Sequence, residues 1–180
     1  MNSQALNPPA SVMRRFKALL YDYLLIFIYL SLLLAINVLL FPSLQGLFNG
    51  SLAVAQFSGF LMVTLPVSLY FIVSDSTLFG QSFGKKKMGI RVVDRNGKPL
   101  PVFRSAFRTA LKFLPWELSH YLVYRLVYLG DAPVPVSYSI IGGIVYALMF
   151  AYLLTALFTR RKQSLYDLIA ATAVIQLAGK

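Results

Sequence analysis

The chain has 180 residues, of which 58% are hydrophobic and 13% are charged, and its formal net charge is +11. This charged share, about half that of an ordinary soluble domain, excludes a soluble globular protein and indicates a multi-pass membrane protein. The excess of basic residues then points to an anionic membrane surface rather than to nucleic acid. The absence of cysteine and the single histidine exclude disulfides, thiol catalysis and multi-histidine metal sites.

The apolar stretches that can cross about 30 Å of hydrocarbon as helices are residues 19–41, 52–73 and 134–158. The first is longer than a signal-peptide core and no small-residue cleavage site follows it, so we expect it to be retained. In the second, Pro66 lies near the middle and frees one backbone carbonyl, which predicts a kink packed against a neighbouring helix.

Basic residues predict the orientation of these spans. Every Lys and Arg except Arg125 lies before the first span, in the central segment 74–112, or in the C-terminal segment 159–180. By the positive-inside rule, both termini and the central segment are expected in the cytoplasm.

An even number of crossings must separate two cytoplasmic segments, so residues 113–131 are expected to cross the membrane as well. This stretch holds Glu117, His120 and Arg125, whose polar face would have to turn into a helical bundle. We therefore predict one domain over residues 1–180, an all-α transmembrane helical bundle with four spans. If 113–131 only lies in the membrane interface, the chain has three spans and the predicted orientation fails at one end.

The last span carries a stripe of small residues at every fourth position, formed by Ser139, Gly143, Ala147, Ala151 and Thr155. Such a stripe lets another backbone approach closely. A neighbouring helix of the same chain and a second copy of the chain both fit it.

The cytoplasmic segments are expected to form a small β-structure. Residues 88–94 alternate as a strand does, 95–98 contain an Asn-Gly dipeptide suited to a tight turn, and 100–102 can return as the second strand of a hairpin. Residues 172–177 are also strand-like and can pair with residues 90–93.

Residues 103–113 place apolar side chains on one helical face and basic side chains on the other, which predicts an amphipathic helix lying on the inner leaflet. The side chains expected to bind anionic lipid head groups by charge are Lys85, Lys86, Lys87, Arg104 and Arg108.

Three motifs, in order along the chain, share a known pattern. Arg15 is followed seven residues later by Asp22 at the start of a span. Residues 80–93 form a glycine-lysine loop that runs into a strand, and residues 161–174 contain Asp167 near the start of a short helix. Together these motifs resemble the RDD family of bacterial membrane proteins, whose arginine-bearing helix corresponds to the segment of Arg104 and Arg108.

The chain departs from the family pattern at Tyr166, where many members have His, and at Ala171, where many have Gly. The resemblance implies a small multi-pass protein of the bacterial inner membrane, named for one Arg and two Asp. It also implies a link to transport, because some members have been connected with monovalent cation/proton antiport.

Asp22 is the sharpest candidate for a functional residue, because a carboxylate about one turn inside a span needs a partner. Arg15 shares its helical face about 10 Å away, and Arg160 or Arg161 fits the role equally well. Asp167 is expected at the same depth. If the two carboxylates meet, their repulsion raises one pKa and creates a site for a proton or for Na⁺. Alternatively each Asp pairs with an Arg and only pins the helix ends.

Glu117 and His120 form a second candidate site, for proton relay, since residues three apart share a helical face. Arg125 lies off to one side of this pair. The competing interpretation is that His120 is an ordinary packing residue.

Two functions fit these residues. The first is a monovalent cation/proton transporter of the Na⁺/H⁺ exchange type, acting as a homo-oligomer, with Asp22 and Asp167 as carriers and Arg15 as counter-charge. The second is a non-transporting scaffold, assembly or lipid-binding factor with a basic cytoplasmic face. No nucleophile–base pair is visible and the loop 80–86 lacks nucleotide-binding spacing, so we expect neither an enzyme nor a cofactor.

Overall fold

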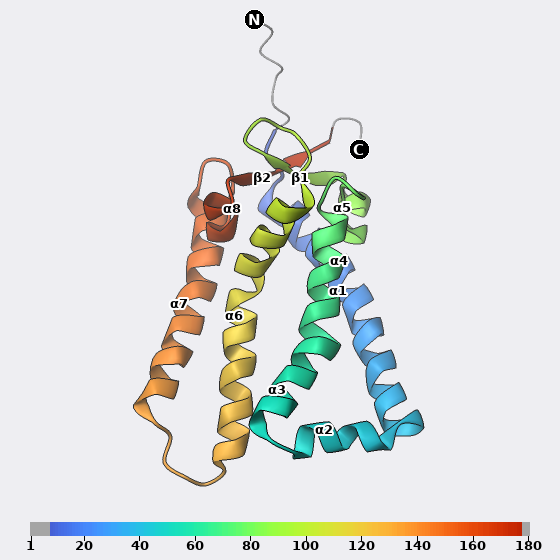
Figure 1. Ribbon diagram of the computed structural model, residues 1–180. Helices are drawn as coiled ribbons and strands as arrows, with labels where there is room; N and C mark the ends of the chain where they lie inside the picture. Colours follow the sequence, from blue (N-terminus) through green and yellow to red (C-terminus); the bar gives the residue numbers. More distant parts are fainter. Residues whose placement is uncertain (1–7, 178–180) are drawn as a thin grey trace, which may run out of the picture.

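The computed structural model describes residues 8–177, and both ends of this described part lie at the same end of the molecule (Figure 1). The predicted C-terminal segment therefore has its last three residues, 178–180, outside the described part. The helices that run along the molecule are α1 (Val12–Ala35), α3 (Leu52–Gly59) continued by α4 (Leu65–Ser74), α6 (Val102–Leu129) and α7 (Val136–Phe158). They lie close together near the chain ends; towards the opposite end α1 diverges from the others, whereas α3 stays beside α6 (Figure 1).

Short elements close the two ends of this bundle. At the far end, a π-helical segment (Ile36–Leu40), a 3₁₀ turn (Pro42–Gln45) and α2 (Gly46–Asn49) lead from α1 to α3. At the near end lie α5 (Phe83–Met88), β1 (Ile90–Asp94), α8 (Leu165–Ile169) and β2 (Thr172–Gln176). We call residues 75–101 and 159–177, with the first turns of α1 and α6, the charged end.

Three helices are long and apolar enough to cross a membrane within the described residues: Val12–Leu40, Leu52–Ser74 and Val136–Phe158. The first begins before the predicted residue 19 because Ser11 caps it, accepting a hydrogen bond from the Arg14 amide at 3.3 Å. Residues 113–131 do not meet the same criterion. Their crossing, and with it the orientation of the chain, stays a prediction.

Helix α6 joins two segments that the sequence analysis treated separately. It runs without interruption from Val102 to Leu129 and packs between α4 and α7 (Figure 1). Residues 103–113 are thus the first turns of a long helix and not a separate interfacial helix. Arg108 and Thr109 on these turns are buried. The polar face of the helix packs against the rest of the protein, whereas the amphipathic pattern predicted contact with lipid head groups.

The two strands pair as an antiparallel sheet, from Ile90 opposite Gln176 to Asp94 opposite Thr172, which confirms the predicted pairing of the chain's tail with its middle. The predicted hairpin is wrong in its second half. The tight turn forms, but residues 99 and 100 make only isolated bridges and α6 begins at Val102. Pro99 and Pro101 have no amide hydrogen to donate, so this segment cannot continue a ladder.

Tyrosine hydroxyls satisfy the carbonyls that in-helix prolines leave free. The carbonyl of Met62, four residues before Pro66, accepts from the Tyr29 hydroxyl of α1 at 2.6 Å, and the helix is π-helical from Phe60 to Thr64. The carbonyl four residues before Pro115 accepts from Tyr152 of α7 at 2.5 Å. Both contacts join neighbouring helices, as the proline argument predicted for the second span.

The small-residue stripe of α7 does not serve as a contact within the chain along most of its length. Ser139, Gly143 and Ala147 are exposed, whereas Val145 is buried. A Cβ added at Gly143 would meet nothing within 4 Å. The reading of the stripe as packing inside one chain is therefore wrong here, and its use by a second copy stays a prediction.

The buried apolar core lies at the charged end and is formed by Ala10, Ala18, Ile90, Val92, Leu100 and Val174. Along α1 and α7, by contrast, large apolar side chains such as Phe27, Leu34 and Phe150 are exposed. Exposed apolar helix faces are expected where hydrocarbon is the solvent.

Gly84 lets α5 lie directly on α1, and we predict that Gly84→Ala destabilises the fold. An added Cβ would collide with the backbone carbonyl of Ala18, which cannot rotate away as a side chain can. We expect a loss of about 1–3 kcal/mol in unfolding free energy, measured for purified protein in detergent. Gly143→Ala is the matched control and should leave stability unchanged or slightly higher; equal behaviour of the two variants would contradict this account.

Candidate functional site

Asp22 is buried on α1, and its carboxylate is surrounded by neutral donors. One oxygen, Oδ1, accepts from the Gly84 amide and from the Tyr70 hydroxyl, both at 2.7 Å. The other, Oδ2, accepts from the Ser82 hydroxyl at 2.7 Å. Since Ser82 and Gly84 begin α5, the positive end of this short helix faces the carboxylate.

Asp75 is a second buried carboxylate, which was not predicted from the sequence. It directly follows α4 and is 1% exposed. Lys85 donates to both of its oxygens, at 2.8 and 2.9 Å, and Arg108 donates to Oδ2 at 3.2 Å. The argument that singled out Asp22, an acidic residue at the edge of an apolar stretch, could have found it.

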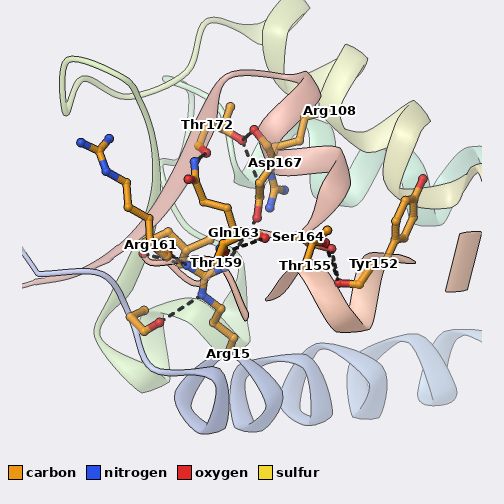
Figure 2. A network of polar contacts seen from close by, with 12 residues as sticks. Arg15, Arg108, Tyr152, Thr155, Thr159, Arg161, Gln163, Ser164, Asp167 and Thr172 are labelled. Carbon is orange, nitrogen blue, oxygen red and sulfur yellow. Dashed lines mark hydrogen bonds and ion pairs between the residues drawn. The ribbon is translucent and has the colours of Figure 1, made fainter. Parts of the chain in front are cut away.

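Asp167 on α8 is held from several sides (Figure 2). Arg108 Nε donates to Oδ1 at 2.8 Å and Thr172 Oγ1 donates to the same oxygen at 3.0 Å. Arg15 forms an ion pair with Oδ2 at 3.6 Å and also donates to backbone carbonyls, including that of Val174 at 3.1 Å. Arg15 therefore joins α1 to α8 and β2, and it does not pair with Asp22.

These contacts form one connected set, which we call the charge network: Arg15, Asp22, Asp75, Lys85, Arg108 and Asp167. Ser82 provides the link to Asp22, because it accepts from Lys85 Nζ at 3.2 Å while donating to Asp22. Arg108 bridges Asp75 and Asp167. The network contains as many basic side chains as carboxylates, so the carboxylates are compensated by protein charges.

The predicted Na⁺ site shared by Asp22 and Asp167 is not assembled in this arrangement. Each carboxylate is bound by its own donors, and Asp75 with its basic partners stands between them in the network. Among the described residues, no group of three or more metal-ligating side chains comes together.

The charges of the network determine the protonation of its members at the charged end. Burial would raise the pKa of the Asp75 carboxyl, but Lys85 and Arg108 outweigh burial and hold its pKa below the usual range. Burial likewise opposes the charge of Arg108, yet Asp167 and the other neighbouring anions raise its pKa above the ordinary value. Both groups are thus held in their charged forms.

A cavity of about 250 Å³ adjoins the network, and we call it the cationic cavity. The charged side chains that line it are Arg15, Asp22, Lys85, Arg108 and Lys112. Lys112 was not anticipated as a site residue. Its ammonium lies 3.5 Å from the centroid of the Phe71 ring, and within residues 8–177 no carboxylate is within 4 Å of it. Burial, with Lys85 and Arg108 close by, lowers the pKa of Lys112 to about 7, so an anion beside this amine would favour its charged form.

The basic residues predicted to bind lipid head groups divide into two sets. Lys86 and Lys87 are exposed, as lipid contact requires. Arg104 is partly exposed and pairs with Asp94 at 3.8 Å. Lys85 and Arg108 are buried and bound to carboxylates, so they are not available to a membrane surface.

Arg161 does not have the predicted role of a partner for Asp22. Its side chain is exposed and points away from Asp167 (Figure 2). Its backbone carbonyl accepts a hydrogen bond from Arg15 at 3.4 Å. It is not the partner of Asp22.

The second predicted cluster lies deeper in the bundle. Glu117 Oε1 lies 3.7 Å from His120 Nδ1 and accepts a hydrogen bond from Thr64, so the two share a face as expected. Arg125 instead donates to Gln56 at 2.9 Å. The cluster joins α6 to the second span and makes no contact with the charge network among the described residues.

A family model confirms the resemblance noted in the sequence, because the RDD family matches residues 9–171. The chain belongs to the RDD family. No curated protein and no solved structure matches it.

The two departures from the RDD pattern have structural consequences. Tyr166 lies with its ring edge to Tyr152, at 5.2 Å between centroids, and under the Arg108 guanidinium at 5.1 Å. Tyr166 therefore packs directly against the charge network through Arg108. Ala171 has φ of 54°, a left-handed conformation that glycine adopts without strain, which explains why glycine suits this position.

The pH dependence of stability tests the role of Asp75. Because its folded pKa is lowered, it stabilises the protein above the unfolded value of about 3.9, and this contribution is lost as pH falls through the folded pKa. We predict that Asp75→Asn costs about 3–5 kcal/mol at pH 7, because Lys85 and Arg108 lose a buried partner. The difference from the parent protein should shrink as pH falls below about 4.

The unfolding free energies of both proteins in detergent, measured between about pH 3 and about pH 7, give this difference. Asp131→Asn is the control, since Asp131 is exposed and should show no such change. A loss that is the same at every pH would mean that the charge of Asp75 is not what stabilises the fold.

Proposed function

We propose that this RDD-family protein is a non-transporting membrane protein that binds anionic lipid at its charged end, placed at the cytoplasmic face. The observation that carries the proposal is Lys112 in the lining of the cationic cavity. The other basic lining residues, Arg15, Lys85 and Arg108, are paired with Asp75 or Asp167, whereas Lys112 has no carboxylate within 4 Å among the described residues. Exposed Lys86 and Lys87 on α5 extend the same charge to the outside of the protein. Basic clusters at a membrane boundary attract anionic head groups.

Electrostatics disfavours a cation in this cavity. Two like unit charges about 5 Å apart repel by about 3 kcal/mol at an effective dielectric constant of about 20. Asp75 and Asp167 compensate Arg108, so Lys112 is the basic side chain that a Na⁺ ion in the cavity would meet without a paired carboxylate. An anion meets the opposite balance and is attracted.

Monovalent cation/proton exchange is the second candidate, and one feature favours it. The donors to Asp22 are all neutral, so its charge is compensated less directly than that of Asp75 or Asp167. Asp22 also lines the cationic cavity. In this candidate Asp22 exchanges a proton for a cation, and the protein acts as a homo-oligomer.

A flux measurement separates the two candidates. Purified protein is reconstituted in liposomes that contain a pH dye, and a Na⁺ gradient is imposed. We predict no proton flux above that of protein-free liposomes. Flux that disappears in Asp22→Asn but persists in the exposed control Asp131→Asn would contradict the proposal and support exchange.

Native mass spectrometry tests the lipid-binding part directly. The protein in detergent is mixed with equal amounts of phosphatidylglycerol, which is anionic, and phosphatidylcholine, which is zwitterionic. We expect retained phosphatidylglycerol to exceed phosphatidylcholine, because only the former adds net negative charge to the basic end. Equal retention of both lipids would overturn the proposal.

A further inference from the structure

The cationic cavity has an apolar neighbour deeper in the bundle. This second cavity also has a volume of about 250 Å³, and we call it the apolar cavity. Its lining residues are Tyr23, Ile26, Phe27, Leu30, Val63, Thr64, Val67, Phe113 and Trp116. Apart from hydroxyl groups and the indole nitrogen, the walls are hydrocarbon.

Helices α1, α4 and α6 each contribute residues to both cavities, and these residues are close in sequence. On α1, Asp22 lines the first cavity and Tyr23 the second. On α6, Lys112 lines the first and Phe113 the second. Phe71 of α4 lines the cationic cavity, and Val67, one turn earlier, lines the apolar one. The cavities are therefore stacked along the bundle, with charge at one end and hydrocarbon at the other.

The cationic cavity also borders surfaces that face outward from the bundle. Phe16 of α1 and Leu153 of α7 line it, and each is 53% exposed. Apolar side chains at this opening suit contact with the hydrocarbon of a bilayer. A ligand can thus reach the cavity from the bilayer, between α1 and α7.

Lys112 supplies the charge that the rest of the site does not use. The other basic residues of the cavity, Arg15, Lys85 and Arg108, are each bound to Asp75 or Asp167. The ammonium of Lys112 packs instead over the rings of Phe71 and Phe113. Burial, Lys85 and Arg108 lower the pKa of Lys112 to about 7, so one negative group of a ligand would stabilise its charged form and balance that charge.

We propose that the two cavities form one site for a single anionic phospholipid, with its phosphate at Lys112 and one acyl chain in the apolar cavity. The inference rests on the proposed function. It replaces general binding of lipid to a basic surface with binding of one lipid at a defined site within the bundle. Free phosphate is the weaker ligand, because it leaves the apolar cavity unfilled.

Trp116 provides a probe, since it is the only tryptophan of the chain and lines the apolar cavity. It is also 42% exposed, so bulk lipid quenches it too, and the difference between two head groups on the same acyl chains reports the site. Protein reconstituted in phosphatidylcholine is titrated with phosphatidylglycerol whose acyl chains are brominated, because bromine quenches tryptophan on contact. Phosphatidylcholine with the same brominated chains is the comparison lipid. We expect the anionic lipid to quench at an approximately fivefold lower mole fraction, the scale of one lysine's attraction to anionic lipid.

Variants then assign the preference to Lys112. Lys112→Gln should remove the difference between the two brominated lipids, and Lys112→Arg should keep it. Lys98→Gln makes the same charge change at an exposed turn residue and should behave as the parent protein. Val67→Phe should weaken quenching by filling the apolar cavity, and free glycerol phosphate should not relieve it. A preference that survives Lys112→Gln, or quenching unaffected by Val67→Phe, would overturn this site.

The outcome also distinguishes the two levels of the proposal. If native mass spectrometry finds the anionic preference but Trp116 quenching does not, the lipid binds elsewhere and only the site is wrong. If neither measurement finds a preference, the proposed function itself fails. The folding of each variant is checked by its unfolding temperature in detergent.

Discussion

The charged end depends on one constraint, which is that buried carboxylates need bound partners: basic side chains at Asp75 and Asp167, and neutral donors at Asp22. Removing a charge from water costs several kcal/mol, on the order of the stability of a whole domain, unless a partner is in place. Asp75 and Asp167 meet this requirement by sharing Arg108, and Lys85 and Arg15 complete the set. Since these residues come from distant parts of the chain, the network fixes where those parts meet.

Beyond the charged end, the bundle is held together differently. Helix α1 diverges from the others (Figure 1), and the direct polar contacts between helices include the tyrosine hydroxyls that bind the carbonyls freed by Pro66 and Pro115. Their remaining surfaces are apolar and exposed. The cationic cavity lies between the charged end and the apolar spans, so we expect it where lipid head groups meet acyl chains. In the proposed function, this position makes lipid a suitable ligand.

Hydropathy and strand periodicity predicted the apolar spans and the β1–β2 pairing, because these depend on patterns within a segment. The partners of the charged residues could not be predicted in this way. Arg15 shares a helical face with Asp22, yet it binds Asp167 on a segment that only the fold brings close. An amphipathic pattern likewise cannot tell whether Arg108 faces lipid head groups or a buried carboxylate. Asp75 was missed because it lies outside the motifs.

A double-mutant cycle on Asp75 and Lys85 tests the central claim most directly. The unfolding free energies of Asp75→Ala, Lys85→Ala and the double variant are compared with that of the parent protein. If the buried charges stabilise one another, the double variant loses less than the sum of the single variants, and the coupling is about 1–3 kcal/mol. Losses that add within about 0.5 kcal/mol would mean that the two charges do not interact, and the network would not be what holds the charged end together.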